Sequence, residues 1–166
     1  MININENVEE IIKKAVEKSL REVNLNTIWY PSSSTVQRKF IYDLTAILNC
    51  NENFDGIIAL SLPQGVVYKI NKMTQIVSSS IENPISIIDK IGRRIAVCLS
   101  KSNMNFRLSG VISRLSDKYP APIPRRLIPF VTNQGNMVIE MYLRKSSTFH
   151  QDNEWWRNYN NFNLEN

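Results

Sequence analysis

The most constraining feature of the sequence is an amphipathic stretch from Asn83 to Ser102, which predicts one long helix. Asn83 can cap its first turn, and Pro84 then takes the first helical position, where a missing N–H costs nothing. One side carries an apolar stripe with members three or four positions apart: Ile85, Ile88, Ile91 or Gly92, Ile95, Cys98 and Leu99. The other side is polar and is expected to face solvent or a partner: Ser86, Asp89, Lys90, Arg93 and Arg94.

Composition bounds the class of protein. With 166 residues, of which 43% are hydrophobic and 21% charged, the chain is large enough for one globular domain with a real core. Its apolar runs are shorter than the roughly 20 residues that span a bilayer. The acidic start MININENVEE is unlike a secretory or transit signal, which favours a cytoplasmic protein. Cys50 and Cys98 form no CxxC motif and His150 is the single histidine, so neither a metal site nor a cofactor is expected.

Two helices and two strands are predicted N-terminal to this stretch. Asn5–Val23 has the helical period, and Pro63–Val77 begins with a first-turn proline. Phe40–Leu48 and Gly56–Leu62 are rich in β-branched and aromatic residues, and the polar residues 49–55 between them indicate a hairpin.

Three more strands are predicted towards the C-terminus. Asn105–Leu115 alternates apolar and polar side chains, and Arg125–Thr132 and Asn136–Arg144 flank an Asn-Gln-Gly turn. Hairpins on both sides of a helical block predict an α+β fold. The sheet is expected to be mainly antiparallel, with the helices on one of its faces.

The remaining stretches are predicted to lack regular structure. Asn24–Ser34 is interpreted as a connection, and Asp117–Pro124 holds three prolines, which a central strand excludes. Residues 1–146 are assigned to one domain. The asparagine-rich tail 147–166 is expected to be partly disordered or to pack back through Trp155-Trp156. The sequence has no visible internal repeat.

The net charge of +5 is concentrated between residues 101 and 145. Against Asp117 and Glu140 stand these basic residues: Lys101, Arg107, Arg114, Lys118, Arg125, Arg126, Arg144 and Lys145. Such a segment could attract nucleic acid or another anionic surface. We favour a solvated sheet face and loop instead, because the aromatic residues typical of RNA-binding surfaces do not accompany the charges.

Several of these strings resemble the CheC/CheX/FliY family of chemotaxis phosphatases, and in particular its CheX-like branch. FDGIIALSLPQGVVYKINKM is similar to the family's strand, turn and following helix, and LIPFVTNQGNMVIEMYL to its last hairpin. Together with the central helix, the resemblance covers most of residues 5–145. It implies an α/β sandwich whose partner is a response-regulator receiver domain or a second copy of the chain in a homodimer.

The family's chemistry depends on a motif in the central helix: Asp or Ser, three residues, Glu, two residues, Asn. Residues three apart share a helix face, so the Glu can pair with a lysine of the regulator while the Asn amide orients the attacking water. In one register of this chain, Arg93 replaces the Glu and Ala96 the Asn. In the other, which we prefer because it needs no deletion before the next strand, Ser86 and Asp89 take these positions. Both registers lack the Glu/Asn pair.

The resemblance therefore implies a CheX-like signalling protein that binds a partner and has lost the catalytic pair. Its predicted binding residues are Asp89, Lys90, Arg93 and Arg94, because guanidinium groups suit phosphates and acidic partners. Two alternatives stay open. One is a divergent phospho-aspartate phosphatase that acts on a CheY-like response regulator through Ser86 and Asp89. The other is the binder of nucleic acid or anionic surfaces through residues 101–145.

Overall fold

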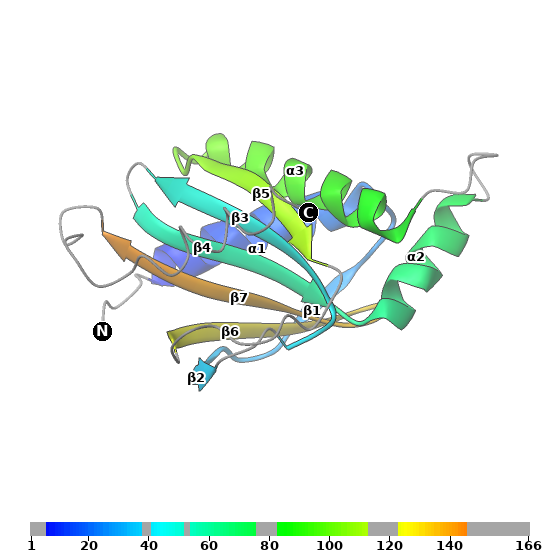
Figure 1. Cartoon of the computed structure of the whole chain (residues 1–166), viewed down its shortest axis with the longest axis horizontal. Coiled ribbons are helices and arrows are strands. Elements are labelled where there is room, and N and C mark those ends of the chain that lie inside the picture. Colours follow the sequence, from blue (N-terminus) through cyan, green and yellow to red (C-terminus); the bar gives the residue numbers. More distant parts are fainter. Residues whose placement is uncertain (1–5, 38–40, 52–53, 76–82, 113–122, 146–166) are drawn as a thin grey trace.

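The computed structural model describes residues 6–37, 41–51, 54–75, 83–112 and 123–145 (Figure 1). The elements follow in the order α1 (Glu6–Arg21), β1 (Thr27–Trp29), β2 (Ser33–Gln37), β3 (Leu44–Asn51), β4 (Phe54–Leu62), α2 (Gln64–Gln75), α3 (Pro84–Ser100), β5 (Phe106–Ile112), β6 (Ile123–Thr132) and β7 (Gly135–Lys145). The predicted tail 147–166 with Trp155-Trp156 lies outside the described residues. The domain assignment of residues 1–146 stays a prediction.

The strands of the described chain form a single antiparallel sheet of seven. Their order is β1-β6-β7-β4-β3-β5, and β2 pairs with β6 beyond the end of β1. The centre of the sheet is the long β4–β7 pair, which runs from Phe54 opposite Lys145 to Ser61 opposite Val138. The predicted α+β fold with a mainly antiparallel sheet is confirmed.

The helices of the described chain pack on one face of this sheet, as predicted. α1 and α3 lie over the strands, and α2 covers the end near the β6–β7 turn (Figure 1). Alternate strand residues point to this side, and they join the apolar stripes of the helices in one buried cluster. Ile12, Ile70 and Ile95 from the helices and Leu60 and Ile139 from the strands are at most 1% exposed. Burying one such side chain contributes about 1.5–3 kcal/mol.

The opposite face of the sheet is crossed by the end of the connection from β2 to β3. The backbone N–H of Ile41 donates to Glu140 Oε1 (2.6 Å), and that of Tyr42 donates to Ser61 Oγ (2.9 Å). Because Glu140 lies on β7 and Ser61 on β4, residues 41–42 lie against the middle of the sheet. Glu140 and Ser61 are consequently buried, at 1% and 0% exposure.

The N-terminal part of the sheet differs from the sequence-based prediction. The interpretation of Asn24–Ser34 as a connection is wrong, because it contains β1 and the start of β2. Both strands are short and pair with β6, so their conformation depends on a distant partner and not on local alternation. The strand predicted at Phe40–Leu48 begins later and runs to Asn51, and the turn predicted at 49–55 is shorter, because Asn49 pairs with Ile57.

β6 contains two prolines, Pro124 and Pro129. The prediction that residues 117–124 lack a strand is wrong for residues 123–124, which belong to β6. Pro124, from the stretch predicted to be irregular, pairs with Val36 of β2. Pro129 lies between β7 and the outer strands, and its carbonyl accepts the N–H of Tyr30 at 3.0 Å. The N–H and C=O of a strand residue point to the same side, so the missing N–H of Pro129 faces the break between β1 and β2. The β6–β7 ladder is therefore intact at this proline.

The order of the elements repeats in two halves of the fold, although the sequence shows no repeat. Each half consists of a helix, an edge segment and a hairpin: α1, β1 and β2, and β3–β4 in the first, and α3, β5 and β6–β7 in the second. Each edge segment pairs with the hairpin of the other half, and the hairpins meet at β4 and β7. α1 and α3, the helices of the two halves, are in contact where Ser19 Oγ lies 3.7 Å from Cys98 Sγ, 79 positions away.

The ends of the two helices match in detail. Asn24 (φ 60°) and Asn103 (φ 58°) both take the left-handed conformation that commonly terminates a helix. The next residue in each case bonds back to the last turn, Leu25 N–H to the Leu20 carbonyl at 3.0 Å and Met104 N–H to the Leu99 carbonyl at 3.1 Å. α1 and α3 are thus equivalent elements of the two halves.

Candidate functional site

α3 is built as its sequence predicts. Asn83 has an extended conformation (φ −63°, ψ 135°), and its side-chain oxygen accepts the N–H of Ile85 at 3.0 Å. The centre of the predicted stripe is buried at 0–1% exposure: Ile88, Ile91, Ile95 and Leu99. Ile85 departs from the prediction, since it lies off the centre of the stripe in the first turn and is 39% exposed.

Gly92 sets the distance between α3 and the sheet. A Cβ at this position would lie 2.7 Å from Leu108 Cδ1 on β5 and 3.3 Å from Ala46 Cβ on β3. Glycine therefore allows the helix to pack closely over two strands. This packing turns the polar side of α3 outward.

The predicted binding residues do not form one cluster. Lys90 and Arg93 are exposed on the outer side of α3, and the Arg93 side chain is 68% exposed. Asp89 is 33% exposed and lies one turn before Arg93. Arg94, at 42% exposure, is directed towards α1. Consecutive arginines point about 100° apart on a helix, which explains the separation.

Asp89 and Arg93 form a two-point ion pair. Arg93 Nε lies 2.7 Å from Asp89 Oδ2, and Nη2 lies 3.4 Å from Oδ1. The hydrogen bond that Arg93 donates to Asp89 raises the pKa of Arg93, and the charge of the carboxylate acts in the same direction. A guanidinium has five N–H donors, so the pair orients Arg93 while leaving it donors for an acidic group of a partner.

Arg94 is tied to the first helix. Its Nε lies 3.4 Å from Glu22 Oε2, and both side chains are nearly half exposed. The sequence analysis missed Glu22, which follows α1 and lies far from Arg94 in the chain. Only the packing of α1 against α3 brings the two together.

The two registers of the family motif place different side chains on the surface. In the preferred register, Ser86 and Asp89 are both partly exposed and lie three positions apart on one side of α3. In the other register, Arg93 is exposed, but Ala96 packs against the core. The preferred register thus places two polar side chains on one face, although Asp89 is engaged by Arg93.

The basic segment 101–145 is not one exposed surface. Arg125 points away from the helices and pairs with Glu140 (Nη1–Oε2 2.7 Å), and both side chains are 1% exposed. Arg126 points to the helix side and pairs with Glu9 of α1 (Nε–Oε2 2.6 Å). Alternation along β6 separates these neighbours. Lys101 and Arg107 are exposed, and Arg114 and Lys118 lie outside the described residues.

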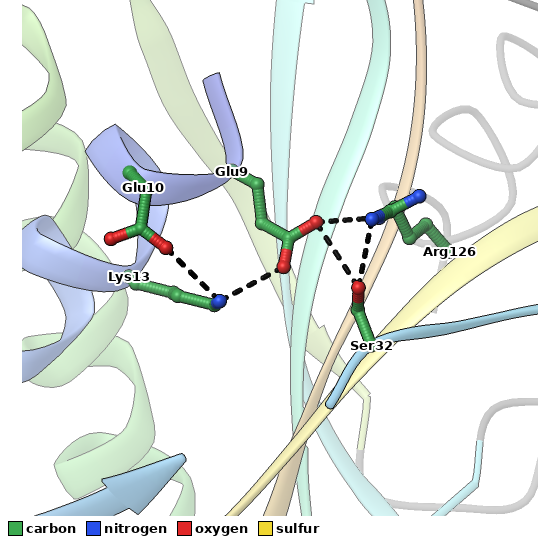
Figure 2. Close-up of polar contacts among 5 residues, drawn as sticks. All are labelled: Glu9, Glu10, Lys13, Ser32 and Arg126. Carbon is green, nitrogen blue, oxygen red and sulfur yellow. Dashed lines mark hydrogen bonds and ion pairs between the residues drawn. The ribbon is translucent and has the colours of Figure 1, made fainter. Parts of the chain in front are cut away.

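Glu9 is the centre of a polar cluster that the sequence analysis did not find (Figure 2). Its carboxylate contacts Lys13 at 2.9 Å, Arg126 at 2.6 Å and the Ser32 hydroxyl at 3.3 Å. Arg126 Nη2 also donates to Ser32 Oγ at 2.8 Å. The cluster joins α1 to the start of β2 and to β6. Its contacts therefore stabilise the packing of the helix on the sheet. The spacing of Glu9 and Lys13 in the sequence predicts only an i,i+4 pair on the surface of a helix.

The described part of the chain has neither a cluster of metal ligands nor a membrane-spanning helix. Within it, histidine, cysteine and carboxylate side chains do not gather in groups of three or more that could hold a metal ion. None of the helices there is both long and apolar enough to cross a bilayer.

Comparison with known proteins gives similarity of structure without similarity of sequence. Neither a family model nor a curated protein sequence matches the chain. The chemotaxis protein CheX from Desulfovibrio desulfuricans superposes with a TM-score of 0.65 at 16% identity, covering 83% of this chain and 99% of that one. A CheC-like superfamily protein from Shewanella sp. PV-4 gives 0.61 at 11% identity, over 85% and 99% of the two chains.

A third match was solved in a complex. CheX of Borrelia burgdorferi, crystallised with CheY, BeF3 and Mg²⁺, has a TM-score of 0.50 at 13% identity and covers 82% of this chain and 97% of its own. The chain is therefore an α+β protein, with one antiparallel sheet and its helices on one face. Within this class, it has the fold of the CheX and CheC proteins.

Proposed function

We propose that this chain is a CheX-like signalling protein that binds another protein through the outer side of α3 and does not catalyse dephosphorylation. The observation that carries the proposal is Arg93, a 68% exposed guanidinium held in place by Asp89. Arginine oriented in this way is suited to a carboxylate or an acylphosphate. The structure of Borrelia CheX in complex with CheY makes a response-regulator receiver domain the partner to test first.

The side chains at the motif positions argue against catalysis. A water held beside a phospho-aspartate needs an amide donor, whereas Asp89 offers a carboxylate whose charge opposes the phosphoryl group. In the other register, Arg93 would repel the lysine of the regulator that the family's Glu attracts. Either arrangement preserves a charged contact surface on α3 and loses the group that positions water.

Charge reversal tests the binding surface. R93E/R94E is expected to weaken binding to a beryllofluoride-activated CheY-like receiver at least tenfold in isothermal titration calorimetry, a loss of about 1.4 kcal/mol. R21E is the matched control, because Arg21 is also 68% exposed and pairs with a carboxylate four residues earlier, Glu17. An R93E/R94E affinity equal to that of wild type, or an equal loss in R21E, contradicts the assignment.

The main rival is a divergent phosphatase that uses Ser86 and Asp89. The half-exposed Ser86 and Asp89 on one face are what favour it. We expect wild-type protein to leave the decay rate of a phosphorylated CheY-like receiver unchanged, because Asp89 is engaged by Arg93. The measurement is release of labelled phosphate with and without the protein. Acceleration that is abolished in D89A would establish the rival.

A further inference from the structure

α2 differs from the other two helices of the described chain in its charges. Its sequence, QGVVYKINKMTQ, contains two lysines, Lys69 and Lys72, and no acidic residue. On α1 and α3, basic side chains pair with carboxylates of the same helix, as Arg21 does with Glu17. Within the described residues, Lys69 and Lys72 have no such ion pair. α2 therefore presents positive charge that its own helix does not neutralise.

An exposed aromatic ring accompanies these two charges. Tyr68 is 58% exposed, and Lys72, one turn later, places its Nζ 5.0 Å from the centroid of the ring. Lys69 is exposed as well. Lysines three positions apart share a side of the helix, so their like charges repel each other and do not stabilise α2. We call Tyr68, Lys69 and Lys72 the α2 patch.

The turn beside α2 adds no negative charge to this surface. α2 lies at one end of the molecule, next to the β6–β7 turn (Figure 1), and Gln134 Nε2 lies 3.7 Å from Met73 Sδ. Residues 132–136 of the turn, TNQGN, are uncharged, and Asn133 and Asn136 are exposed. The described residues of α2 and of this turn thus carry basic charges and no acidic ones.

Charge complementarity decides which partner suits the α2 patch. Tyrosine is enriched where proteins bind each other, and charges at the rim of such a contact attract a partner of opposite sign. A carboxylate bound between Lys69 and Lys72 would also relieve their mutual repulsion. Nucleic acid matches the patch less well, because a strand is held by a basic groove along its backbone and α2 supplies two cations. A second copy of the chain, with its net charge of +5, would be repelled.

We propose that the α2 patch binds an acidic segment of another protein. The patch lies on a different helix from Arg93, so this interaction is additional to binding through α3 and does not depend on it. R93E/R94E is accordingly expected to bind an acidic probe as wild type does. Loss of receiver binding through α3 and loss of the α2 interaction are therefore distinguishable.

Nuclear magnetic resonance of the isotope-labelled full chain tests the proposal, with poly-L-glutamate as the probe at about 0.15 M salt. The largest changes in amide chemical shift are expected within residues 64–75. K69E/K72E is expected to raise the apparent dissociation constant about tenfold or more. K69Q/K72Q, which removes the charges without reversing them, should also weaken binding while leaving the melting temperature unchanged. Y68A should weaken binding in the same assay, because it removes the ring.

K14E/K18E is the matched control. Lys14 and Lys18 are exposed on α1, and the change alters the net charge by the same amount as K69E/K72E. This variant is expected to keep the wild-type shifts at residues 64–75. Shifts spread evenly over α1 and α2, an equal loss in K14E/K18E, or no shift at millimolar glutamate residues would overturn the proposal. A stronger response to an oligothymidylate of equal charge would overturn it as well and assign the α2 patch to nucleic acid.

Discussion

At the scale of single residues, two glutamates show how the same side chain can be used in opposite ways. Burial raises the pKa of Glu9, but hydrogen bonds from Lys13 and Arg126 outweigh that effect, and the net pKa is lowered. Burial also raises the pKa of Glu140, and there the N–H of Ile41 and the charge of Arg125 only partly compensate, so the net pKa is raised. Glu9 therefore stabilises the fold as an anion, whereas burial disfavours the ionised form of Glu140.

Glu9 gives the first residue-scale prediction. E9Q is expected to lower the free energy of unfolding at pH 7 by about 1.5–3 kcal/mol, because Lys13 and Arg126 lose a charged acceptor. The matched control is E10Q: Glu10 is 56% exposed and pairs with the same Lys13, so its loss should stay within about 0.5 kcal/mol. Urea unfolding followed by circular dichroism measures both, and equal losses would contradict the role of Glu9.

The pH dependence of this difference has a defined sign. A carboxylate whose pKa is lower in the folded than in the unfolded state stabilises the fold above its unfolded pKa, about 4.3. The contribution disappears as the pH falls through the lower folded pKa. The gap between wild type and E9Q should thus be constant near neutral pH and shrink below about pH 4. Comparing wild type with E9Q removes the opposite contribution of Glu140, which the two proteins share.

At the scale of elements, the central β4–β7 pair depends on one glycine. Gly56 has φ +138°, and a Cβ there would lie 1.9 Å from the carbonyl oxygen of Tyr142 on β7. This backbone atom belongs to the neighbouring strand in the middle of the sheet and cannot move aside as a flexible side chain would. The position excludes other residues through both its backbone conformation and its neighbour.

Alanine substitution separates this role from a general effect of glycine. G56A is expected to destabilise the protein by more than about 3 kcal/mol, because it combines a strained φ with a backbone clash. G65A should instead stabilise it by about 0.5–1 kcal/mol, since Gly65 lies in α2 with nothing within 4 Å of its Cβ position. Thermal melting distinguishes the two, and similar melting temperatures for both variants would contradict the account of Gly56.

At the scale of the whole molecule, the basic residues of the segment 101–145 do not all lie on one surface. Arg125 and Arg126, adjacent in sequence, pair with Glu140 and Glu9 on opposite faces of the sheet. The basic segment seen in the sequence therefore does not gather into one electropositive patch over the described residues. A nucleic-acid interface needs such a patch.

This arrangement predicts weak, unspecific behaviour towards nucleic acid. The protein is expected to show no binding to double-stranded DNA or single-stranded RNA in fluorescence anisotropy at 0.15 M salt, although weak binding at low salt is consistent with a net charge of +5. Partner binding through α3 should in contrast survive physiological salt. Tight nucleic-acid binding that collapses as salt rises and is unaffected by R93E/R94E would favour the nucleic-acid rival.

The sequence by itself determined the elements that carry their own periodicity. α1, α2, α3 and the strands of the two hairpins follow from apolar stripes, alternation, the Asn83 cap and the Gly135 turn, because these signals act over a few residues. The identity of the polar side of α3 followed in the same way. So did the α+β class, since hairpins and helices arrive in blocks.

Only the tertiary structure decided the rest. β1 and β2 are strands because β6 lies beside them, and Arg94 meets Glu22 and Glu9 meets Arg126 because α1 packs beside α3 and over the sheet. The split of the predicted binding residues also became visible only there. The physical reason is that pairing and burial join residues far apart in the chain, and no local pattern records which distant side chain will be the partner.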